Sequence, residues 1–346
     1  MMKAYWRGAL AAACFGLCLT PSLAADKVTV GVISSLSDAA FYIAADRGYF
    51  KDVGIDVEFV TFDSAAKMIA PLATGDLDVG TGASSAGLFN AAARSIDLKI
   101  VADRSGMAPG YQFMTLMIRK ALVDSGEFKG YADLKGKKIA LASPAISPGS
   151  GLNEAAKKGG LTFADVEKVY LGYPQQVAAL TNGAIDGSMM IEPFATRLVE
   201  TGVGVRFSST EDFYPGLQIA LVYYGEKFTT TRKELAQRFM VAYVRAMRDY
   251  NDVVKDGLFT DTQKSKDIVS ILAKRLGNTE ADIKKSYVYF ADPNGKPNVV
   301  GLQKDLDFFR ANGDVKNPKV KVEDLLDLSF IEAAVKQLGP YVRSDK

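Results

Sequence analysis

One frame of residues occurs twice in this chain and constrains its fold more than any other feature. The segments APLATGDLDVG at 70–80 and AALTNGAIDGS at 178–188 share the pattern Ala-x-Leu-x-x-Gly-x-apolar-Asp. Gly75 and Gly183 stand where a helix would end, because glycine readily adopts the left-handed conformation that closes a helix. Asp78 and Asp186, at the start of the next strand, would be turn residues. The repeat therefore predicts the same helix-to-strand turn in each of two similar units.

Strand and helix patterns alternate on both sides of each copy. Short β-branched runs such as VTVGVI at 28–33 and IDVEFV at 55–60 are typical of buried strands. Between them, residues 39–50 have apolar side chains at helical spacing. The pattern restarts at 133. It predicts, in each unit, a largely parallel sheet with helices on both faces and a ligand crevice at the carboxyl ends of the strands.

Two segments are expected to connect the units. TLMIRKALVD at 115–124 would leave the first unit, and IALVYYGEKF at 219–228 would return to it. We therefore predict a discontinuous lobe I formed by residues 25–118 and 225–346, and a lobe II formed by residues 119–224. Two crossings form a hinge, so the lobes can close on a ligand.

The first 24 residues are typical of a secretory signal. Lys3 and Arg7 precede an apolar run that is too short to span a bilayer as a membrane anchor, and Ser22 and Ala24 are small residues suited to cleavage after Ala24. We expect residues 1–24 to be removed and the rest of the chain to act in the periplasm.

The composition of the remaining chain excludes several chemistries. Cys14, Cys18 and Trp6 all lie in the first 24 residues, and the sequence has no histidine. A disulfide scaffold, a zinc site built from Cys or His, a Ser-His-Asp triad and a cysteine nucleophile are therefore impossible after cleavage. Without Lys3 and Arg7, 40 basic residues balance 40 acidic ones, so a nucleic-acid partner is not expected. We expect no cofactor and no metal.

Polar residues follow the predicted strands in the loops that would line the crevice. The candidate ligand-binding residues are Ser35, Phe41, Ser84, Ser85 and Arg104 in the first unit and Ser147, Ser150, Tyr173, Gln175 and Glu192 in the second. Three helices of the second unit would begin at Pro148, Pro174 and Pro193. Serine hydroxyls and the free N–H groups of helix starts suit a carboxylate, sulfonate or phosphate. We therefore expect a solute with an anionic or strongly accepting group.

Several candidates also have a purely structural interpretation. A serine at a helix start can cap its own helix, Phe41 can pack in the core on the inner face of its helix, and Glu192 can serve the hinge. Arg104 is the best-placed cation for an acidic group. Flat contacts that favour an aromatic or heteroaromatic solute would come from Phe41, Tyr173 and either Tyr111 or Tyr214.

Four segments carry a resemblance to a known family. FYIAADRGYFKDVGIDVEFV, APLATGDLDVG, DLKGKKIALASP and VAALTNGAIDGSMMIEPF resemble, in this order, the solute-binding proteins of ABC importers for nitrate, sulfonates, taurine and thiamine-pyrimidine precursors. The resemblance implies an α/β, two-lobe type II periplasmic binding protein fold with a two-crossover hinge. It also implies that the protein holds a small solute between its lobes and delivers it to a membrane permease driven by an ATPase. We expect a monomer.

Other classes of protein share parts of this pattern. A pyrimidine synthase of the same family uses a histidine after the first strand and a cysteine-rich motif. Here the position that matches the histidine is Asp38 and no cysteine is available after cleavage, which excludes that enzyme. A dinucleotide-binding enzyme is the second alternative, since Gly80 and Gly82 follow a strand and Asp103 ends the next one. Ser85 replaces the third glycine of that fingerprint. An exported sensor module is the third alternative, which the sequence does not separate from a transport protein.

Overall fold

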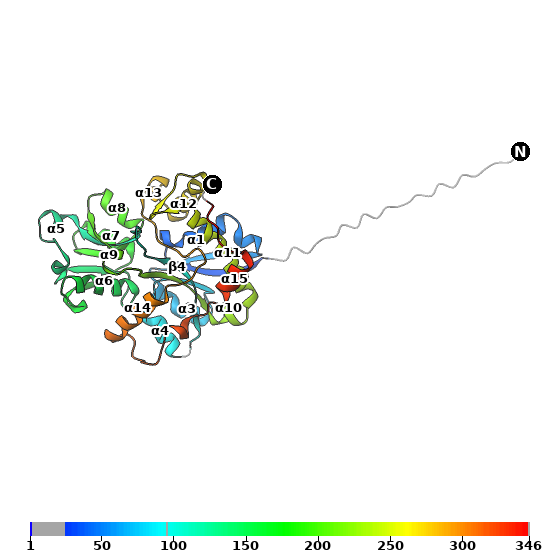
Figure 1. The fold of residues 1–346 in the computed structure, drawn as a ribbon, viewed down its shortest axis with the longest axis horizontal. Coiled ribbons are helices and arrows are strands. Elements are labelled where there is room, and N and C mark those ends of the chain that lie inside the picture. Colours follow the sequence, from blue (N-terminus) through cyan, green and yellow to red (C-terminus); the bar gives the residue numbers. More distant parts are fainter. Residues whose placement is uncertain (2–24, 95, 345–346) are drawn as a thin grey trace.

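The structure is a computed structural model, and it describes residue 1, residues 25–94 and residues 96–344. The predicted signal sequence falls, apart from Met1, outside the described residues. Two sheets with helices on both sides form two lobes that lie side by side (Figure 1). The predicted α/β, two-lobe architecture is confirmed.

The sheet of lobe I has five strands in the order β2-β1-β3-β10-β4. They are β1 (Asp26–Val32), β2 (Ile55–Thr61), β3 (Val79–Gly82), β4 (Leu98–Gly106) and β10 (Gln218–Gly225). β1 pairs in parallel with β2 and β3, whereas β10 lies antiparallel between β3 and β4. The carboxyl ends of β1, β3 and β4 therefore meet at one edge of this sheet.

The sheet of lobe II repeats this plan in the order β7-β6-β8-β5-β9. Its strands are β5 (Met114–Arg119), β6 (Lys138–Leu141), β7 (Glu167–Tyr170), β8 (Gly187–Ile191) and β9 (Gly204–Ser209). Here β5 is the antiparallel strand, paired with β8 and β9. In each lobe the strand that arrives from the other lobe is inserted antiparallel beside three parallel strands.

The lobe boundaries that the sheets define differ from the predicted ones. The prediction placed residues 114–118 in lobe I and residues 218–224 in lobe II, but β5 belongs to the sheet of lobe II and β10 to the sheet of lobe I. The reason is that each strand is a full member of the sheet it enters and not the connection itself. The chain crosses between the lobes earlier, at 107–113 and at 214–217.

The helices cover the two sheets and add a large C-terminal layer to lobe I. Lobe I carries α1 (Ala39–Asp46), α2 (Tyr49–Asp52), α3 (Ile69–Thr74), α4 (Ala86–Ala93), α10 (Glu226–Thr230), α11 (Lys233–Asp252), α12 (Gln263–Leu276), α13 (Glu280–Lys285), α14 (Val299–Ala311) and α15 (Ser329–Leu338). Lobe II carries α5 (Lys120–Asp124), α6 (Ser147–Lys158), α7 (Tyr173–Thr181), α8 (Phe194–Glu200) and α9 (Thr210–Phe213). In lobe I, a small hairpin of β11 (Val254–Lys255) and β12 (Leu258–Phe259) follows α11. The apolar face of α11 packs on α1 and α15.

The repeated frame has the same structure in both lobes. Gly75 and Gly183 each have a φ of +78°, which a residue with a side chain rarely adopts. Asp78 accepts the N–H of Thr29 on β1 and pairs with Arg232. Asp186 likewise accepts the N–H of Lys138 on β6 and pairs with Arg119. Both aspartates tie a turn to the start of the neighbouring strand, at the opposite end from the strands' carboxyl termini, and they take no part in the crevice.

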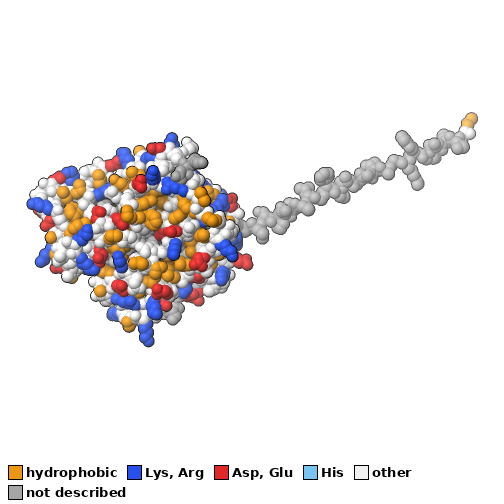
Figure 2. All heavy atoms as spheres, in the orientation of Figure 1, with side chains coloured by type: hydrophobic (Ala, Val, Ile, Leu, Met, Phe, Trp, Pro, Cys, Tyr) orange, Lys and Arg blue, Asp and Glu red, His pale blue; other side chains and the backbone are white. Residues whose placement is uncertain are grey.

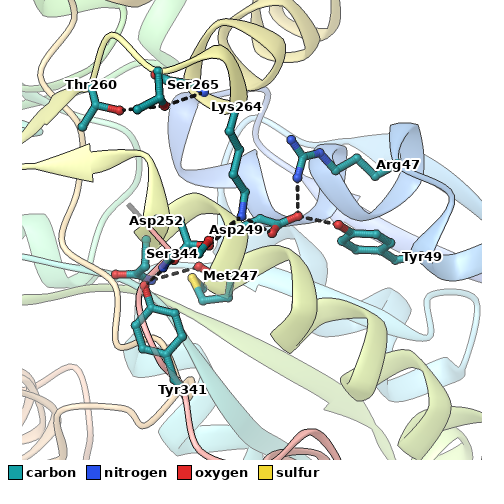
Figure 3. Close-up of polar contacts among 12 residues, drawn as sticks. Arg47, Tyr49, Met247, Asp249, Asp252, Thr260, Lys264, Ser265, Tyr341 and Ser344 are labelled. Carbon is teal, nitrogen blue, oxygen red and sulfur yellow. Dashed lines mark hydrogen bonds and ion pairs between the residues drawn. The ribbon is translucent and has the colours of Figure 1, made fainter. Parts of the chain in front are cut away.

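Ion pairs secure the C-terminal layer (Figure 3). Asp249 of α11 accepts hydrogen bonds from Arg47 and Tyr49 at 2.5 Å each, and Lys264 of α12 contacts it at 2.7 Å. Lys264 also donates a hydrogen bond to Asp252 at 2.5 Å, and the carboxylate of Asp252 accepts a second one from the Tyr341 hydroxyl at 2.8 Å. The network joins α11, α12 and the end of the chain to the region between α1 and α2, so it is a structural clamp within lobe I.

Candidate functional site

The two lobes touch through the starts of two helices. The backbone N–H of Ala86 on α4 donates to the carbonyl of Ala145 at 2.9 Å, and the N–H of Ser147 on α6 donates to the carbonyl of Ser84 at 3.0 Å. These bonds form a short bridge between Ser85 and Ile146 across the crevice. The structure is therefore closed. At the start of α6, where free N–H groups were expected for an anion, the N–H of Ser147 is satisfied by the opposite lobe.

The helices α13 and α14 also reach lobe II, on opposite flanks of the crevice. Figure 1 shows α13 beside α8 and α14 beside α6. On the first flank, Lys285 forms an ion pair with Glu200 at 2.6 Å. The C-terminal layer of lobe I thus encloses the crevice from both sides.

Arg104, at the end of β4, is the central buried cation of the interface between the lobes. Its guanidinium donates from Nε to the carbonyl of Ser37 at 2.9 Å and from Nη2 to Asp38 Oδ1 at 2.5 Å. The other oxygen of Asp38 accepts the N–H groups of Ile33 and Ser35. Burial raises the pKa of Asp38, and the charge of Arg104 and these N–H groups oppose that rise. The Asp38 carboxylate thereby fixes the orientation of the guanidinium.

The third nitrogen of Arg104 is an unsatisfied donor. Arg104 is 1% exposed, and Nη1 has no hydrogen-bond partner among the described residues. A buried N–H of a charged group without an acceptor costs about 1–3 kcal/mol or more. Most buried polar groups in proteins are satisfied, and Arg104 Nη1 is one of several exceptions among the described residues, which also include Arg206 Nη1 and Ser105 Oγ.

Tyr173 lies on the lobe II side of Arg104. It is buried at the start of α7 and its ring stacks on Phe194, with centroids 6.0 Å apart and planes 14° from parallel. Burial raises the pKa of the Tyr173 hydroxyl, and the positive charge of Arg104 partly offsets this rise. Tyr173 begins α7 directly after the β7 strand of lobe II, and Arg104 stands near the carboxyl end of β4 in lobe I.

A second polar cluster surrounds Asp305 on α14. The Ser84 hydroxyl donates to Asp305 Oδ2 at 2.5 Å, and the Tyr214 hydroxyl lies 3.3 Å from Oδ1. The Ser150 hydroxyl also acts to lower the pKa of this carboxyl group. Burial raises the pKa of Asp305 to about 7, against the lowering effect of the three hydroxyls. Ser84 comes from lobe I and Ser150 from lobe II, so this cluster too spans the interface.

A groove of about 640 Å³ opens beside this cluster, between α6 and α14. Ser150 and Tyr214 line it together with the aromatic residues Phe163 and Phe308, whose rings meet edge to face at 5.1 Å. The groove gives solvent a path to the interface between the lobes. Elsewhere on the face shown in Figure 2, acidic and basic side chains are interspersed, as the balanced charge of the chain predicts.

Three of the candidate residues lie outside this site. Phe41 is fully buried in lobe I, where its ring packs on Phe239 and Tyr243 of α11, so its core interpretation is the correct one. Gln175 is exposed on α7. Glu192 accepts the N–H of Thr196 and pairs with Arg206 at 2.5 Å, so both of its oxygens are used within lobe II.

The serines have divided roles. Ser85 accepts the N–H of Leu88 and caps α4, as the capping interpretation predicts. Ser147 donates to the carbonyl of Ile219, 3.4 Å away, and Ser35 bonds the hydroxyl of Ser37 at 2.8 Å. All three are buried at the crevice and have partners within the chain; those of Ser85 and Ser35 are local, whereas the bond from Ser147 crosses to β10 of lobe I. Arg104, by contrast, has one nitrogen, Nη1, without a partner among the described residues.

Two residues with strained backbone occupy equivalent loops at this edge. Ser34 follows β1 with a φ of +57°, and Ala145 follows β6 with a φ of +49°. Residues other than glycine in this region store strain, which occurs preferentially at functional sites. The strain agrees with a binding site at the carboxyl ends of β1 and β6.

The glycines of the dinucleotide alternative serve packing instead. A Cβ on Gly80 would lie 2.6 Å from the Leu72 side chain, and one on Gly82 would lie 2.6 Å from Ala65. Asp103 accepts hydrogen bonds from the Gln218 side chain and from a backbone N–H, so its carboxylate is used beside the hinge. Residues 25–94 and 96–344 contain no cluster of three or more acidic, Cys or His residues suited to a metal ion. Within these ranges, no helix has the length and apolar character needed to cross a membrane.

Two α/β lobes that are joined by two crossings and close over buried polar groups from both sides define a binding protein for a small solute. The chain belongs to the NMT1-like family, whose model matches residues 23–257. The alternative of a dinucleotide-binding enzyme is not supported by this match or by the glycine contacts.

Known proteins with similar sequence or fold include both binding proteins and an enzyme. The taurine-binding periplasmic protein of Escherichia coli (strain K12) is 27% identical over 260 residues, which are 74% of this chain and 75% of that protein. The periplasmic nitrate-binding protein NrtA from Synechocystis PCC 6803 has a TM-score of 0.73 at 16% identity, covering 91% of this chain and 89% of its own. The desulfurization enzyme DSZB has a TM-score of 0.62 at 16% identity, covering 91% of this chain and 100% of its own.

Proposed function

We propose that this protein is the solute-binding component of an ABC importer and that it closes on a small organic anion, with Arg104 as the residue that binds the anionic group. The observation that carries this proposal is the unsatisfied Nη1 of a guanidinium that is 1% exposed and held in place by Asp38. An oxygen atom of a bound sulfonate or carboxylate would accept a hydrogen bond from Nη1 and complete the hydrogen bonding of Arg104.

The organic part of the solute would contact Tyr173 and Phe194 on the other lobe. A ligand that contacts both lobes binds the closed form better than the open one and shifts the population toward closure. The taurine-binding relative supports a sulfonate as the anionic group. A membrane permease would then recognise the closed form and receive the solute.

The protein would act in the periplasm as a monomer and without chemistry of its own. The chain after residue 24 has no Cys or His, and it therefore lacks two of the side chains most used as nucleophile and general base near neutral pH. The hydrogen bond from Arg104 to Asp38 orients the guanidinium as a donor, which is what a binding site requires.

The test compares wild type with Arg104→Lys by titration calorimetry against small sulfonates and carboxylates. Lysine keeps the positive charge beside Asp38 but lacks the second branch of the guanidinium. Loss of a hydrogen bond to a charged group is worth about 1.5–3 kcal/mol, so affinity should fall about 10- to 150-fold. Arg245→Lys, on the exposed side of α11, is the matched control and should bind as wild type does. Equal affinities of wild type and Arg104→Lys would remove Arg104 from the site.

A further inference from the structure

The carboxyl group of Asp305, on α14 of lobe I, lies at a direct contact between the lobes. Asp305 is 0% exposed. Ser84 donates its hydroxyl to Asp305 Oδ2 at 2.5 Å, and the backbone carbonyl of Ser84 accepts the N–H of Ser147, the first residue of α6 in lobe II, at 3.0 Å. Ser150, also on α6, and Tyr214 line the groove that opens beside this cluster. Lobe II therefore covers the carboxyl group, and separation of the lobes would expose it to water.

The described part of the chain supplies no positive charge to this carboxyl group. None of the ion pairs among residues 25–94 and 96–344 includes Asp305. The charged side chains of α6 and α14 that line the groove are Glu154, Lys157, Lys304 and Asp307. Glu154 pairs with Lys157 at 2.7 Å, and the Nζ of Lys304 lies 5.2 Å from the centre of the Tyr214 ring. These charges are engaged away from Asp305.

Neutral hydroxyl groups surround the carboxyl group instead. From β10, the Tyr223 hydroxyl donates to two backbone carbonyls, and burial raises its pKa. The Tyr214 hydroxyl lies 3.3 Å from Asp305 Oδ1 and 3.3 Å from the carbonyl of Gly301. A hydroxyl has one proton to donate, so both of these hydrogen bonds form together only when a protonated Asp305 donates to the hydroxyl oxygen. The closed packing therefore suits a neutral carboxyl group.

Closure changes the proton affinity of this group. A buried carboxyl group without a cation loses its charge more readily than it bears the loss of hydration, and burial raises the pKa of Asp305 to about 7. Exposed to water in an open form, the group would have the ordinary aspartate pKa of about 4. Between these two values the closed form binds one more proton than the open form, so it gains stability as pH falls. Above about pH 7 the group is ionised in both forms, and this dependence ends.

Other groups give less response to closure in this pH range. The sequence has no histidine, the side chain that ordinarily changes charge between about pH 5 and 8. Burial also raises the pKa of Asp103 to about 7, but the donors to its carboxylate lie in lobe I, as Asp103 itself does. The buried carboxylates of Asp38 and Glu192 each have an arginine partner. Asp305 is therefore the unpaired carboxyl group whose surroundings closure alters.

We propose that Asp305 is a proton-dependent latch between the lobes: its carboxyl group takes up a proton from the solvent as the lobes close, so that acidification favours the closed form. The latch acts on closure itself and goes beyond the proposed function, because it does not depend on which solute binds. A solute that prefers the closed form binds more tightly at lower pH, and at higher pH the lobes open and release it more readily.

The test measures closure and binding at about pH 5.5 and about pH 7.5. X-ray scattering gives the radius of gyration of the mature protein without solute. Titration calorimetry gives its affinity for methanesulfonate and 2-hydroxyethanesulfonate, whose sulfonate group stays anionic at both values. At the lower pH, wild type should be more compact or should bind the sulfonates more tightly, by on the order of tenfold. Asp305→Asn keeps the shape of the side chain but does not titrate, and it should show neither change.

Two further variants separate the latch from a structural role. Asp307→Asn removes a carboxylate of 62% exposure from the same helix and should keep the pH response of wild type. Ser84→Ala removes a hydroxyl that lowers the pKa of Asp305, so the response should move to higher pH. A purely structural contact would not move it. Ser84→Ala also covers the case in which Asp305→Asn fails to fold.

Two results would overturn the inference. If wild type shows neither response, or if Asp305→Asn retains the full response, Asp305 is an interlobe contact only, and the proposed anion site at Arg104 is unaffected. If no sulfonate or carboxylate binds at either pH, the proposed function fails, whereas the radius of gyration still decides whether the latch exists.

Discussion

Replacement of Asp38 by Asn tests the physical basis of the Arg104 site. The substitution keeps the shape of the side chain but leaves a guanidinium that is 1% exposed without its counter-charge. Breaking a buried ion pair by removing one partner typically costs about 3–5 kcal/mol. The amide also cannot accept from Arg104 and from the N–H groups of Ile33 and Ser35 together. For a lobe of roughly 200 residues, this loss lowers Tm by roughly 6–20 °C.

The assay is urea unfolding followed by far-UV circular dichroism, because the chain after residue 24 has no tryptophan. Asp52→Asn is the matched control, since the pair of Asp52 with Arg245 is exposed and should contribute only about 0–1 kcal/mol. If Asp38→Asn loses no more stability than Asp52→Asn, the pair does not hold Arg104 rigidly, and the argument that its free nitrogen is preorganised for a ligand fails.

Three further predictions concern other parts of the molecule. Gly159→Ala should destabilise lobe II by about 1–3 kcal/mol in urea unfolding, because a Cβ would lie 2.4 Å from the backbone of Tyr131; an unchanged midpoint would refute this contact. Burial alone would raise the pKa of Asp252, but hydrogen bonds, first that of Lys264, hold it below its ordinary value. Its contribution to stability is therefore complete above the unfolded pKa of about 4 and is lost as pH falls through the lower folded pKa; Asp252→Asn should show less of this acid loss, and an equal loss would contradict the assignment. Ser150→Trp should keep the lobes apart and raise the radius of gyration measured by X-ray scattering with solute present, and a closed variant would show that Ser150 is not at the interface.

The two-lobe fold was predictable because its signals are local. Gly75 and Gly183 end helices for a conformational reason that one residue carries, and the β-branched runs identify their strands without knowledge of the partner strand. The roles of Pro148 and Pro174 in the first turns of α6 and α7 were predictable for the same reason. Pro193 immediately precedes α8.

The lobe boundaries required tertiary information. β5 and β10 join their sheets as antiparallel strands between partners that are distant in sequence. A strand pattern predicts that a segment forms a β-strand, but it does not indicate which sheet the strand joins. The crossings at 107–113 and 214–217 therefore appeared only in the folded structure.

The site was predictable in its location more than in its contacts. The loops after the strands do converge, and Arg104 was the cation expected there. Gln175 was chosen by position, although the exposed side of α7 carries it and its neighbour Gln176 is the buried one, bonded to Leu171 and Ser188. A shift of one residue, about 100° around the helix axis, decides between such neighbours, and helix boundaries read from sequence are not accurate enough to place it.

Asp305 was missed because it belongs to no motif. A signal was nevertheless present: in the segment VVGLQKDLDFFRA, Asp305 stands at helical spacing with Leu302, Leu306 and Phe309, on the face that packs into lobe I. An acidic residue in an apolar helical stripe requires a buried partner. The identity of that partner depends on the approach of lobe II, which no local pattern contains.

The most direct test of the central claim is a crystal structure of the mature protein with the solute that copurifies from the periplasm. The account predicts an anionic oxygen within hydrogen-bond distance of Arg104 Nη1, an organic group against Tyr173, and closed lobes. A solute bound away from Arg104, or held by one lobe alone, would contradict it.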